Sequence, residues 1–538
     1  MKLTDLIKPF IDELTINIDS SIMSINIKGV TTYSPNAKSG WLFLCIKGSK
    51  TDRHKYIADA AKRGAVAAII DNPKYKNSAI PTVLVKNVNS VYDSIIAKFY
   101  GNPEKEILLA AITGTDGKTT TCAMIQQLLD KKIGSGKIAN FGTNGAIFAS
   151  QKIHLENTTP DSEIFYPLLR EFVQKGAKIA ILEFSSEAQH YNRLKNLEFD
   201  IIALTSITSD HLNTHKTLKN YINAKYNIFK NHLKNKGAAI LNSSDENYQS
   251  FKQKIAKNKP AAQIITYGYK SKDNWQIKKI HQNNANLEIN YKTENQEFVV
   301  DLNILGRYNG YNYICAAAAA SQIEKIIQNK NLNNIKYFES KKAKKTTISK
   351  NTSASKTSIS KEDNLINFLT FNFQIPGRVN LFNTSKKYSV LIDYAHTFEA
   401  IKQLIQTVKL LPHQKIIVIT GMAGSRDKTK RKKIGTLLEK EADQIILTQD
   451  DPHFENNQII IKDILQGVKN KDKTLIIENR AQAIEKSLDL ANIGDIILIL
   501  GKGDDDYIIQ NNKKIPFNDI KYLKSIFSKA GITYTSEF

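Results

Sequence analysis

Cysteine is scarce in this 538-residue chain, and no run of apolar residues approaches the length of a membrane span. The three cysteines, Cys45, Cys122 and Cys315, stand far apart among apolar or small residues, which excludes a disulfide framework and metal-ligand spacing. A membrane-spanning helix needs about 20 mostly apolar residues. The N-terminus has acids within its apolar pattern and lacks the small-residue cleavage site of a signal peptide. We therefore expect a cytoplasmic protein without membrane insertion.

Acidic residues are also few beside basic ones, and the formal net charge is +24. Such an excess can attract nucleic acid or phosphate-rich ligands. The lysines are spread along the chain, however, and no stripe of interleaved basic and aromatic residues accompanies them. We interpret most of the charge as a solvated surface and expect no nucleic-acid partner. A nucleic-acid-stimulated ATPase is kept as an alternative.

Apolar runs alternate with helical patterns in three α/β regions, as expected at about 150 residues per domain. We predict an N-terminal domain over 1–105, a central domain over 106–338 and a C-terminal domain over 376–538. Residues 339–363 are rich in Ser, Thr and Lys with almost no apolar content, which predicts a flexible insertion. A linker over 364–375 follows it.

Buried strands separated by helices predict parallel sheets in the last two domains. In the central domain such strands are expected within 177–186, 199–208 and 237–245. The C-terminal domain has five apolar runs, and polar clusters follow several of them: DYAH, GSRDK, DDPHFE and GKGDDDY. Ligands bind at the carboxyl ends of strands in such sheets.

A phosphate-binding loop is the clearest motif. The segment ILLAAITGTDGKTTTCAMIQQLLDKK has the order of a buried strand, a glycine-containing turn and an amphipathic helix. Glycine lets backbone N–H groups approach phosphate oxygens, Lys118 can meet the β- and γ-phosphate charge, and a threonine hydroxyl can hold Mg²⁺. We predict that ATP is bound by Gly114, Thr115, Asp116, Gly117, Lys118, Thr119 and Thr120.

Three further polar residues are candidates for the nucleotide's metal. Glu183 follows a buried strand, where a carboxylate that supports nucleotide-bound Mg²⁺ is often found. His211 also follows a strand, but a lone histidine there is more often structural. Lys225 on its own would be one more solvated helical lysine.

These residues belong to a series of motifs that resembles the Mur ligases. The order and spacing are similar to the MurE type, UDP-N-acetylmuramoyl-dipeptide:amino-acid ligase, over the whole chain except the insertion. The motifs are GTDGKTTT, NTTPD, LEFSSEAQHYNR, SITSDHLNTHKTLKNYINAKYNIF, LGRYNGYN, IPGRVNLF, IDYAHT, GSRDKTKRKKIG, TQDDPHFE and GKGDDDY. The resemblance implies a three-domain α/β architecture with a central P-loop ATPase domain and a Rossmann-like C-terminal domain.

The resemblance also implies the reaction. The γ-phosphate of ATP moves to the D-glutamate carboxylate of UDP-MurNAc-L-Ala-D-Glu, and the amine of an amino acid then displaces phosphate from the acyl phosphate. Lys118, Glu183, His211 and Lys225 would be catalytic. The implied cofactors are ATP, two Mg²⁺ ions and a CO₂-derived carbamate on Lys225, with metal ligands Thr119, Glu183, His211 and that carbamate. We expect a monomer whose partners are the UDP-MurNAc-dipeptide, ATP and an amino acid.

Further site residues follow from the same resemblance. Asn312, Arg378 and His396 match residues near the nucleotide. The expected contacts of the UDP-substrate are Ser34, Ser49, Lys50, Thr51, Asn157, Thr158, Thr159, Ser185, Tyr191 and Arg193. The chain departs from the family at Tyr33 and Pro35, where Asp-Ser-Arg is frequent, and at Tyr191, where a polar contact is common.

The loop 450–453 bears on the choice of amino acid. Enzymes that add meso-diaminopimelate usually have Asp-Asn-Pro-Arg, whose guanidinium can bind the extra carboxylate in a bidentate manner. This chain has Asp-Asp-Pro-His instead, and two aspartates would favour a side-chain ammonium. We expect L-lysine, with meso-diaminopimelate or ornithine as alternatives, bound by Arg426, Asp450, Asp451, Pro452, His453, Gly501 and Asp505. A folate polyglutamate or muramyl-tripeptide-recycling ligase is a further alternative, against which NTTPD and DDPHFE argue.

Overall fold

The computed structural model places most of the chain in two compact units. Its described residues are 1–13, 22, 24–48, 51–76, 78–283, 286–294, 296–329, 367–373, 375–511 and 513–537. The first unit comprises Met1–Ala111, Ser135–Ile202 and Asn227–Gly237; the second comprises Ile112–Gly134, Ala203–Tyr226 and Ala238–Phe538. The predicted insertion at 339–363 and the candidate residues Ser49 and Lys50 lie outside the described residues.

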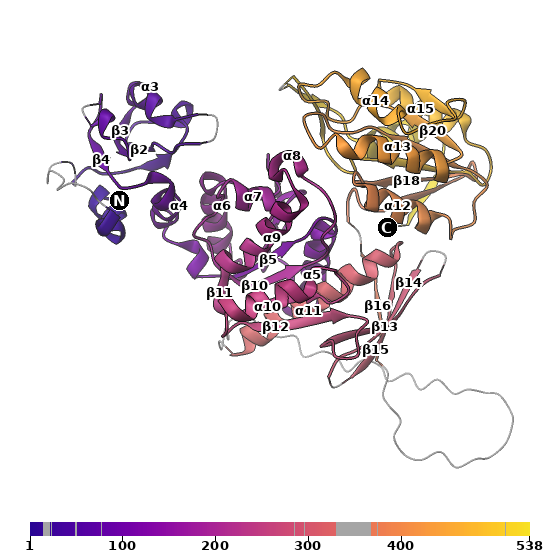
Figure 1. Cartoon of the computed structure of the whole chain (residues 1–538), viewed down its shortest axis with the longest axis horizontal. Coiled ribbons are helices and arrows are strands. Elements are labelled where there is room, and N and C mark those ends of the chain that lie inside the picture. The colour runs from indigo at the N-terminus through magenta and orange to yellow at the C-terminus, as the bar shows by residue number, and fades with distance from the viewer. Residues whose placement is uncertain are drawn as a thin grey trace, which may run out of the picture. The chain divides into compact units, whose positions relative to one another are not determined.

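A parallel four-stranded sheet forms the N-terminal part of the first unit, coloured indigo in Figure 1. Its strands pair in chain order: β1 Gly29–Thr31, β2 Trp41–Leu44, β3 Ala65–Ile70 and β4 Thr82–Leu84. Phe43, Cys45 and Ile70 are buried in its core, which agrees with the apolar runs of the sequence. The helices around it are α1 Leu3–Ile7, η1 Lys8–Glu13, η2 Ser34–Asn36, η3 Arg53–Tyr56, α3 Ile57–Lys62, η4 Pro73–Tyr75, α4 Val88–Phe99 and η5 Pro103–Lys105.

The largest sheet has twelve strands in the order β16-β15-β14-β13-β12-β11-β10-β5-β9-β6-β7-β8. Strands β5 Leu108–Thr113, β10 Phe199–Leu204 and β11 Leu233–Asn242 begin in the first unit and end in the second. With β9, β10 and β11 the structure confirms the three buried strands expected in the central region. The remaining elements of the first unit are β6 Ile138–Gly142, β7 Gly145–Phe148, β8 Gln151–Ile153, β9 Ile179–Glu183, α6 Ser162–Gln174 and α7 Ser186–His190.

An antiparallel extension that the sequence did not predict continues this sheet in the second unit. It consists of β13 Trp275–Asn283, β14 Asn286–Lys292 and β15 Glu297–Leu302, joined to β11 through the parallel strand β12 Gln263–Gly268. Strand β16 Asn367–Phe371 pairs with β15 and lies inside the segment expected to be a linker, because Phe368, Leu369 and Phe371 make it apolar enough to extend a sheet. The helices here are α5 Lys118–Ile133, α8 Leu212–His215, α9 Leu218–His232, α10 Tyr248–Asn258 and α11 Arg307–Asn329.

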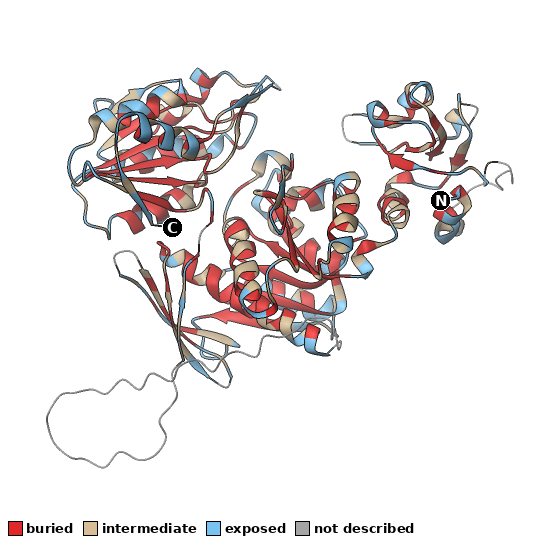
Figure 2. Cartoon of the chain, turned by 180° about the vertical axis from the view of Figure 1, so that it is seen from behind, coloured by how far each residue is buried: buried red, intermediate tan, exposed pale blue. Residues whose placement is uncertain are grey.

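A seven-stranded sheet forms the C-terminal part of the second unit, in the order β21-β20-β19-β22-β18-β17-β25. Its first five strands are parallel and confirm the five apolar runs of the sequence. Figure 2 shows the central strands of this sheet buried, among them β19 and β22. Their bounds are β18 Ser389–Asp393, β19 Ile416–Thr420, β20 Gln444–Leu447, β21 Thr474–Ile476 and β22 Ile496–Leu500; the antiparallel strands are β17 Asn380–Thr384 and β25 Tyr534–Glu537.

Helices and one hairpin complete this C-terminal part. The helices are α12 Phe398–Val408, α13 Thr429–Glu441, α14 Asn457–Leu465, α15 Arg480–Leu490 and α16 Asp519–Lys529, and the hairpin is β23 Tyr507–Gln510 with β24 Lys513–Pro516. Across the part of the chain that the structure describes, no helix is long and apolar enough to cross a membrane. The predicted domain boundaries stay predictions.

Candidate active site

The predicted phosphate loop lies between the end of β5 and the start of α5. Gly114 and Gly117 both have left-handed backbone angles, with φ of 151° and 86°. A Cβ on Gly114 would collide with the Thr205 hydroxyl, and one on Gly117 would collide with the Asn312 amide oxygen. Both glycines are therefore required by the close packing of the loop, and Asn312 of α11 lies beside it.

The side chains at the start of α5 are held over this loop. Lys118 Nζ donates to the carbonyl oxygens of Gly114 and Thr115, at 3.0 and 2.9 Å. The Thr119 hydroxyl, which is buried with that of Thr120, accepts a hydrogen bond of 3.1 Å from the Arg378 guanidinium. Arg378 comes from the C-terminal part of the chain. The structure thus brings three predicted nucleotide residues, Lys118, Thr119 and Arg378, to one place.

Asp393, at the end of β18, organises the two turns that carry Arg378 and His396. Its carboxylate accepts hydrogen bonds from the backbone N–H groups of Val379 and Ala395, at 2.8 and 2.7 Å. His396 Nδ1 donates to the Tyr394 carbonyl at 2.9 Å. Burial lowers the pKa of His396 to about 3, so the ring is neutral at physiological pH.

Lys225 is a buried lysine, with 1% of its surface exposed, rather than a solvated one. Its Nζ donates to the Gly114 carbonyl at 2.7 Å and lies 4.7 Å from the centre of the Tyr221 ring. Burial, together with the charge of Lys118, lowers the pKa of Lys225 well below its usual range. The structure therefore places Lys225 beside the phosphate loop, and its expected role as a metal ligand stays a prediction.

Asp210, Thr397 and Lys430 are polar residues near the loop that the sequence reasoning did not single out. Asp210 precedes His211, whose φ is 55°, and receives Lys430 Nζ at 3.3 Å. Burial alone would raise the pKa of Asp210, but the charges of Lys430 and the nearby histidines hold it below its usual range. The Thr397 hydroxyl donates to the carboxylate of Asp116 at 3.3 Å. The partners in each pair, Asp210 with Lys430 and Asp116 with Thr397, are far apart in the sequence, so only the structure reveals them.

Glu183 lies in the first unit, at the end of β9, with 3% of its surface exposed. Its carboxylate accepts hydrogen bonds from the backbone N–H and the hydroxyl of Thr143, at 2.8 and 3.2 Å. The Thr143 hydroxyl also lies 3.3 Å from that of Thr158, and the Thr159 hydroxyl donates to the Glu183 carbonyl at 2.8 Å. The predicted metal carboxylate and the predicted substrate threonines are therefore neighbours.

The other substrate candidates of the first unit cluster around Thr159. The hydroxyl of Ser185 lies 3.3 Å away and caps α7. Arg193 pairs with Asp161 at 3.0 Å, and the exposed ring of Tyr191 lies 5.8 Å from its guanidinium. Asn157 directly precedes Thr158 and Thr159 in the sequence.

Thr31 and Thr32, which the sequence reasoning missed, connect the N-terminal part to the same segment. Both hydroxyls donate to the carboxylate of Glu163, and the Thr32 backbone N–H does so at 2.9 Å. Ser34, close to them in sequence, is buried, whereas Thr51 is exposed. Glu163 lies two residues after the NTTPD motif, so its carboxylate joins Thr31 and Thr32 to the segment that contains this motif.

A buried lysine lies among the aspartates expected to bind the amino acid. Lys502 Nζ is 2.9 Å from Asp451 and 3.8 Å from both Asp450 and Asp505. Burial raises the pKa of Asp505 to about 7, against the charge of Lys502. Lys502 therefore compensates much of the negative charge that was expected to select a substrate ammonium, which weakens the sequence argument for L-lysine.

The remaining amino-acid candidates surround this cluster. Gly501 has a φ of 108°, and a Cβ there would lie 2.5 Å from the Asp450 carboxylate. Pro452 and His453 follow the aspartates in the same loop, and burial lowers the pKa of His453. Arg426 is exposed on the neighbouring loop.

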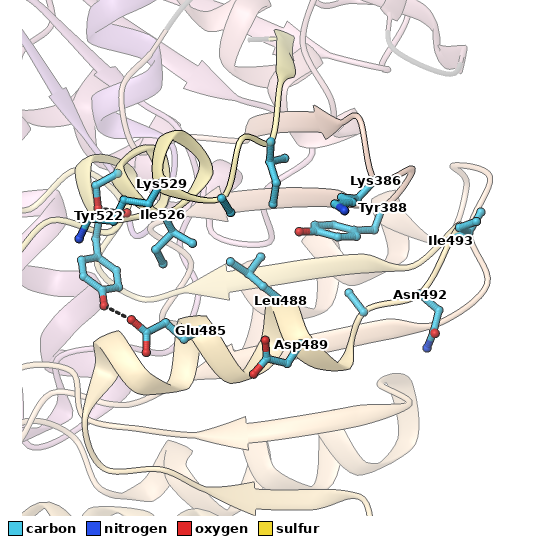
Figure 3. A pocket seen from close by; sticks show the side chains of 14 residues that line it. Lys386, Tyr388, Glu485, Leu488, Asp489, Asn492, Ile493, Tyr522, Ile526 and Lys529 are labelled. Atoms are coloured by element: carbon cyan, nitrogen blue, oxygen red, sulfur yellow. Dashed lines mark hydrogen bonds between the residues drawn. The ribbon is translucent and has the colours of Figure 1, made fainter.

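A separate hollow of the C-terminal part contains none of the predicted site residues. It is lined by Tyr388, Leu488 and Ile526 together with charged side chains such as Lys386 and Glu485 (Figure 3). Tyr388 precedes β18 and Ile493 precedes β22, so this hollow lies at the amino ends of the strands. The predicted ligand residues follow the carboxyl ends instead.

Family models match most of the chain. The Mur ligase family catalytic-domain model matches residues 26–110, the Mur ligase middle-domain model matches 112–320, and the Mur ligase glutamate ligase domain model matches 377–503. The UDP-N-acetylmuramoyl-L-alanyl-D-glutamate--2,6-diaminopimelate ligase of Aquifex aeolicus is 32% identical over 514 residues, which cover 96% of each chain. The chain belongs to the Mur ligase family. It is therefore an ATP-dependent, ADP-forming acid–amino-acid ligase of peptidoglycan biosynthesis.

Solved structures confirm the Mur ligase fold. A structure of a UDP-N-acetylmuramoyl-L-alanyl-D-glutamate--2,6-diaminopimelate ligase aligns with a TM-score of 0.59 and 22% identity over 99% of each chain. The MurF ligase of Thermotoga maritima in complex with ADP aligns with a TM-score of 0.56 and 17% identity, over 94% of this chain and 97% of that one. The predicted α/β class and the ligase activity are confirmed.

Proposed function

We propose that this Mur ligase adds the third amino acid to UDP-N-acetylmuramoyl-L-alanyl-D-glutamate, and that this amino acid is meso-diaminopimelate. The observation that carries the proposal is the similarity to the diaminopimelate ligase of Aquifex aeolicus along 96% of both chains. The loops that follow the C-terminal strands have the charged residues needed for an amino acid that carries both ammonium and carboxylate groups.

In the proposed reaction, a carboxylate oxygen of the substrate's D-glutamate attacks the γ-phosphorus of ATP, and ADP leaves. The amine of the amino acid then attacks the acyl phosphate, loses a proton and expels inorganic phosphate from the tetrahedral intermediate. Lys118 binds the Gly114 carbonyl of the phosphate loop, and Arg378 binds Thr119 at the start of α5. Their two positive charges would stabilise the transferring phosphoryl group. The chain needs no covalent nucleophile for this chemistry.

Magnesium ions would be held by Thr119, Glu183, His211 and a carbamate on Lys225. A carbamate on Lys225 would add an anionic oxygen ligand, the type that Mg²⁺ prefers. Lys225 fits the formation of a carbamate, because it is buried against the phosphate loop with its pKa lowered, and only a neutral amine can attack CO₂. Bound magnesium would reduce the repulsion between phosphate and carboxylate oxygens.

L-Lysine is the second candidate, supported by His453. The arginine expected for a diaminopimelate carboxylate is absent from this position, and burial lowers the pKa of the histidine that replaces it. Against this, Lys502 is bonded to Asp451 and lies close to Asp450, so these acids have an internal cation. Arg426, exposed on the neighbouring loop, could bind a carboxylate of either substrate.

The test is ATP-dependent phosphate release with UDP-MurNAc-L-Ala-D-Glu and each of meso-diaminopimelate, L-lysine and L-ornithine. We expect the highest kcat/KM with meso-diaminopimelate. A higher value with L-lysine would overturn the choice of amino acid, and turnover with none of the three would overturn the proposal. The matched control is the same assay with His453→Arg, which should raise the preference for meso-diaminopimelate further, because a bidentate guanidinium is added.

A further inference from the structure

Two loops of the C-terminal sheet are bonded directly to each other. One follows β19 and contains Arg426; the other follows β20 and contains residues 450–455. The Gly424 N–H donates to the Asp451 carbonyl at 2.8 Å, and a Cβ on Gly424 would collide with the Pro452 carbonyl. The backbone of His453 is left-handed, with a φ of 52°. This conformation is unfavourable for a histidine, so the surrounding contacts must hold it in place.

Glu455 is the side chain that joins these two loops to a helix. Its carboxylate accepts the Ser425 N–H at 3.0 Å and both terminal nitrogens of Arg431, at 2.7 and 2.9 Å. Arg431 lies on α13 and is completely buried. A bidentate guanidinium–carboxylate pair fixes orientation as well as distance. The position of the loop at 450–455 therefore depends on α13.

Arg431 has a second acidic partner that does not touch either loop. Its Nη1 donates to the Asp463 carboxylate of α14 at 2.9 Å, so α13 and α14 are joined independently of Glu455. Arg431 thus binds one carboxylate in the loop, Glu455, and one on α14, Asp463. Mutation of each acid separately therefore distinguishes an effect on loop position from an effect on helix packing.

The other side of the loop is held by the hairpin strand β23. The His453 N–H donates to the Ile509 carbonyl at 2.9 Å, and the Ile509 N–H donates to the Asp451 carboxylate at 2.8 Å. Asp451 also receives Lys502. Residues 451–453 are thus bound to β23 on one side. On the other side, Glu455 binds the loop that contains Arg426.

We infer that Arg431 and Glu455 are positioning residues, which hold the Asp451–His453 segment against the Arg426 loop and so determine the affinity for the incoming amino acid. The inference rests on the proposed function, because it takes these two loops as the amino-acid site. Both residues act through the loops. A misplacement of about 1 Å in a binding group can cost a large factor in catalytic efficiency.

The kinetic test is Glu455→Gln, which keeps the size of the side chain but loses the charge that holds the guanidinium and the Ser425 N–H. We expect the KM for the amino acid to rise about tenfold, while the KM values for ATP and the UDP-substrate change less than about twofold. Arg431→Lys, which keeps a cation but loses the fork, should act in the same direction. Glu455→Asp, which keeps the charge, should restore part of the affinity.

Two control variants distinguish the positioning of the loop from a general effect on the stability of the fold. Asp463→Asn removes the other partner of Arg431, and Glu441→Gln removes an ion pair of α13 with Lys409 at 2.6 Å. Both should leave the amino-acid KM within about twofold of the wild type. The inference is overturned if Asp463→Asn raises this KM as much as Glu455→Gln, or if Glu455→Gln changes kcat alone.

Hydrogen exchange of the free chain tests the loop contact without any substrate. The amides of Gly424 and Ser425 should exchange about tenfold faster in Glu455→Gln than in the wild type, and unchanged in Asp463→Asn. Unchanged exchange in Glu455→Gln would overturn the inference even if the enzyme is active. Failure of the wild type to use any tested amino acid would instead overturn the proposed function, and the exchange result would still stand.

Discussion

Lys225 and Lys502 are both buried lysines, yet their surroundings shift their pKa values in opposite directions. Lys225 meets a carbonyl and the charge of Lys118, so burial lowers its pKa. Lys502 meets three aspartates, which raise its pKa against the effect of burial. Composition and local pattern treat both as ordinary lysines, and only the motif resemblance singled out Lys225. The opposite shifts in pKa become visible only with the three-dimensional neighbours. Their expected roles differ accordingly: Lys225 as a reactive amine, Lys502 as an internal counter-ion.

Lys225→Ala should remove most of the ligase activity, by about a hundredfold or more, because the proposed metal site loses its carbamate. Added acetate or formate should restore part of the activity by supplying a free carboxylate. The measurement is ADP release at saturating substrates. Lys219→Ala, an exposed lysine of the same helix α9, is the control and should behave like the wild type. Full activity of Lys225→Ala without rescue would contradict the carbamate.

Asp505 should make the affinity for the amino acid depend on pH. Burial raises its pKa to about 7, so the carboxyl is mainly protonated below pH 7 and ionised above it. An ionised Asp505 attracts the substrate ammonium, so the amino-acid KM should fall as the pH rises through about 7. The measurement is KM between pH 6 and pH 8.5, roughly one and a half units around this pKa. Asp505→Asn should flatten the profile; an unchanged profile would exclude Asp505 as the titrating group.

At the scale of elements, the sequence predicted the parallel strands and missed the antiparallel ones. The runs IIVIT, QIIL and IILIL are buried on both faces and became β19, β20 and β22, because continuous apolar runs are typical of covered parallel strands. Strand β14 alternates apolar and polar residues. In β13 a bulge between Ile277 and Lys279 interrupts the alternation, so neither the bulge nor the pairing of the two strands was evident from the sequence. The phosphate loop was predictable because strand, turn and helix are contiguous; the Arg431–Glu455 pair was not.

The connection between α13 and the loop at 450–455 should also affect stability in a pH-dependent way. The bond to Arg431 lowers the pKa of Glu455 to about 2 from an ordinary value of 4.5, despite its burial. A depressed folded-state pKa stabilises the fold above the unfolded value and is lost as pH falls toward the folded value. Glu455→Gln should therefore be less stable than the wild type at pH 7, and the difference should shrink between about pH 4.5 and pH 2. Urea unfolding at several pH values measures this; a constant difference would contradict it.

At the scale of the whole molecule, composition predicted the class of protein better than its substrate. The three cysteines, expected to form no disulfide framework, are free and buried. Among the described residues, no helix is long and apolar enough to cross a membrane. The net charge of +24 gave no information about the amino acid, because in the proposed site the choice of substrate depends on a few charges near Lys502. Specificity is a difference between affinities that bulk charge does not determine.

Replacement of residues 339–363 by a shorter Gly/Ser linker should leave kcat and both substrate KM values within about twofold of the wild type. The segment has almost no apolar residues that could contribute to a core, and long surface insertions are tolerated thermodynamically. Steady-state kinetics and thermal unfolding of the two proteins measure this. A loss of activity with an unchanged melting temperature would assign the segment a functional role.

Strands β5, β10 and β11 each begin in one unit and end in the other, which has a consequence for cutting the polypeptide. A break anywhere between residues 113 and 367 leaves strands of the twelve-stranded sheet on separate fragments. Folding of the nicked protein would then become a bimolecular association whose yield depends on fragment concentration. Neither unit is therefore expected to fold when it is expressed separately. Split or truncated variants should have their break outside this interval.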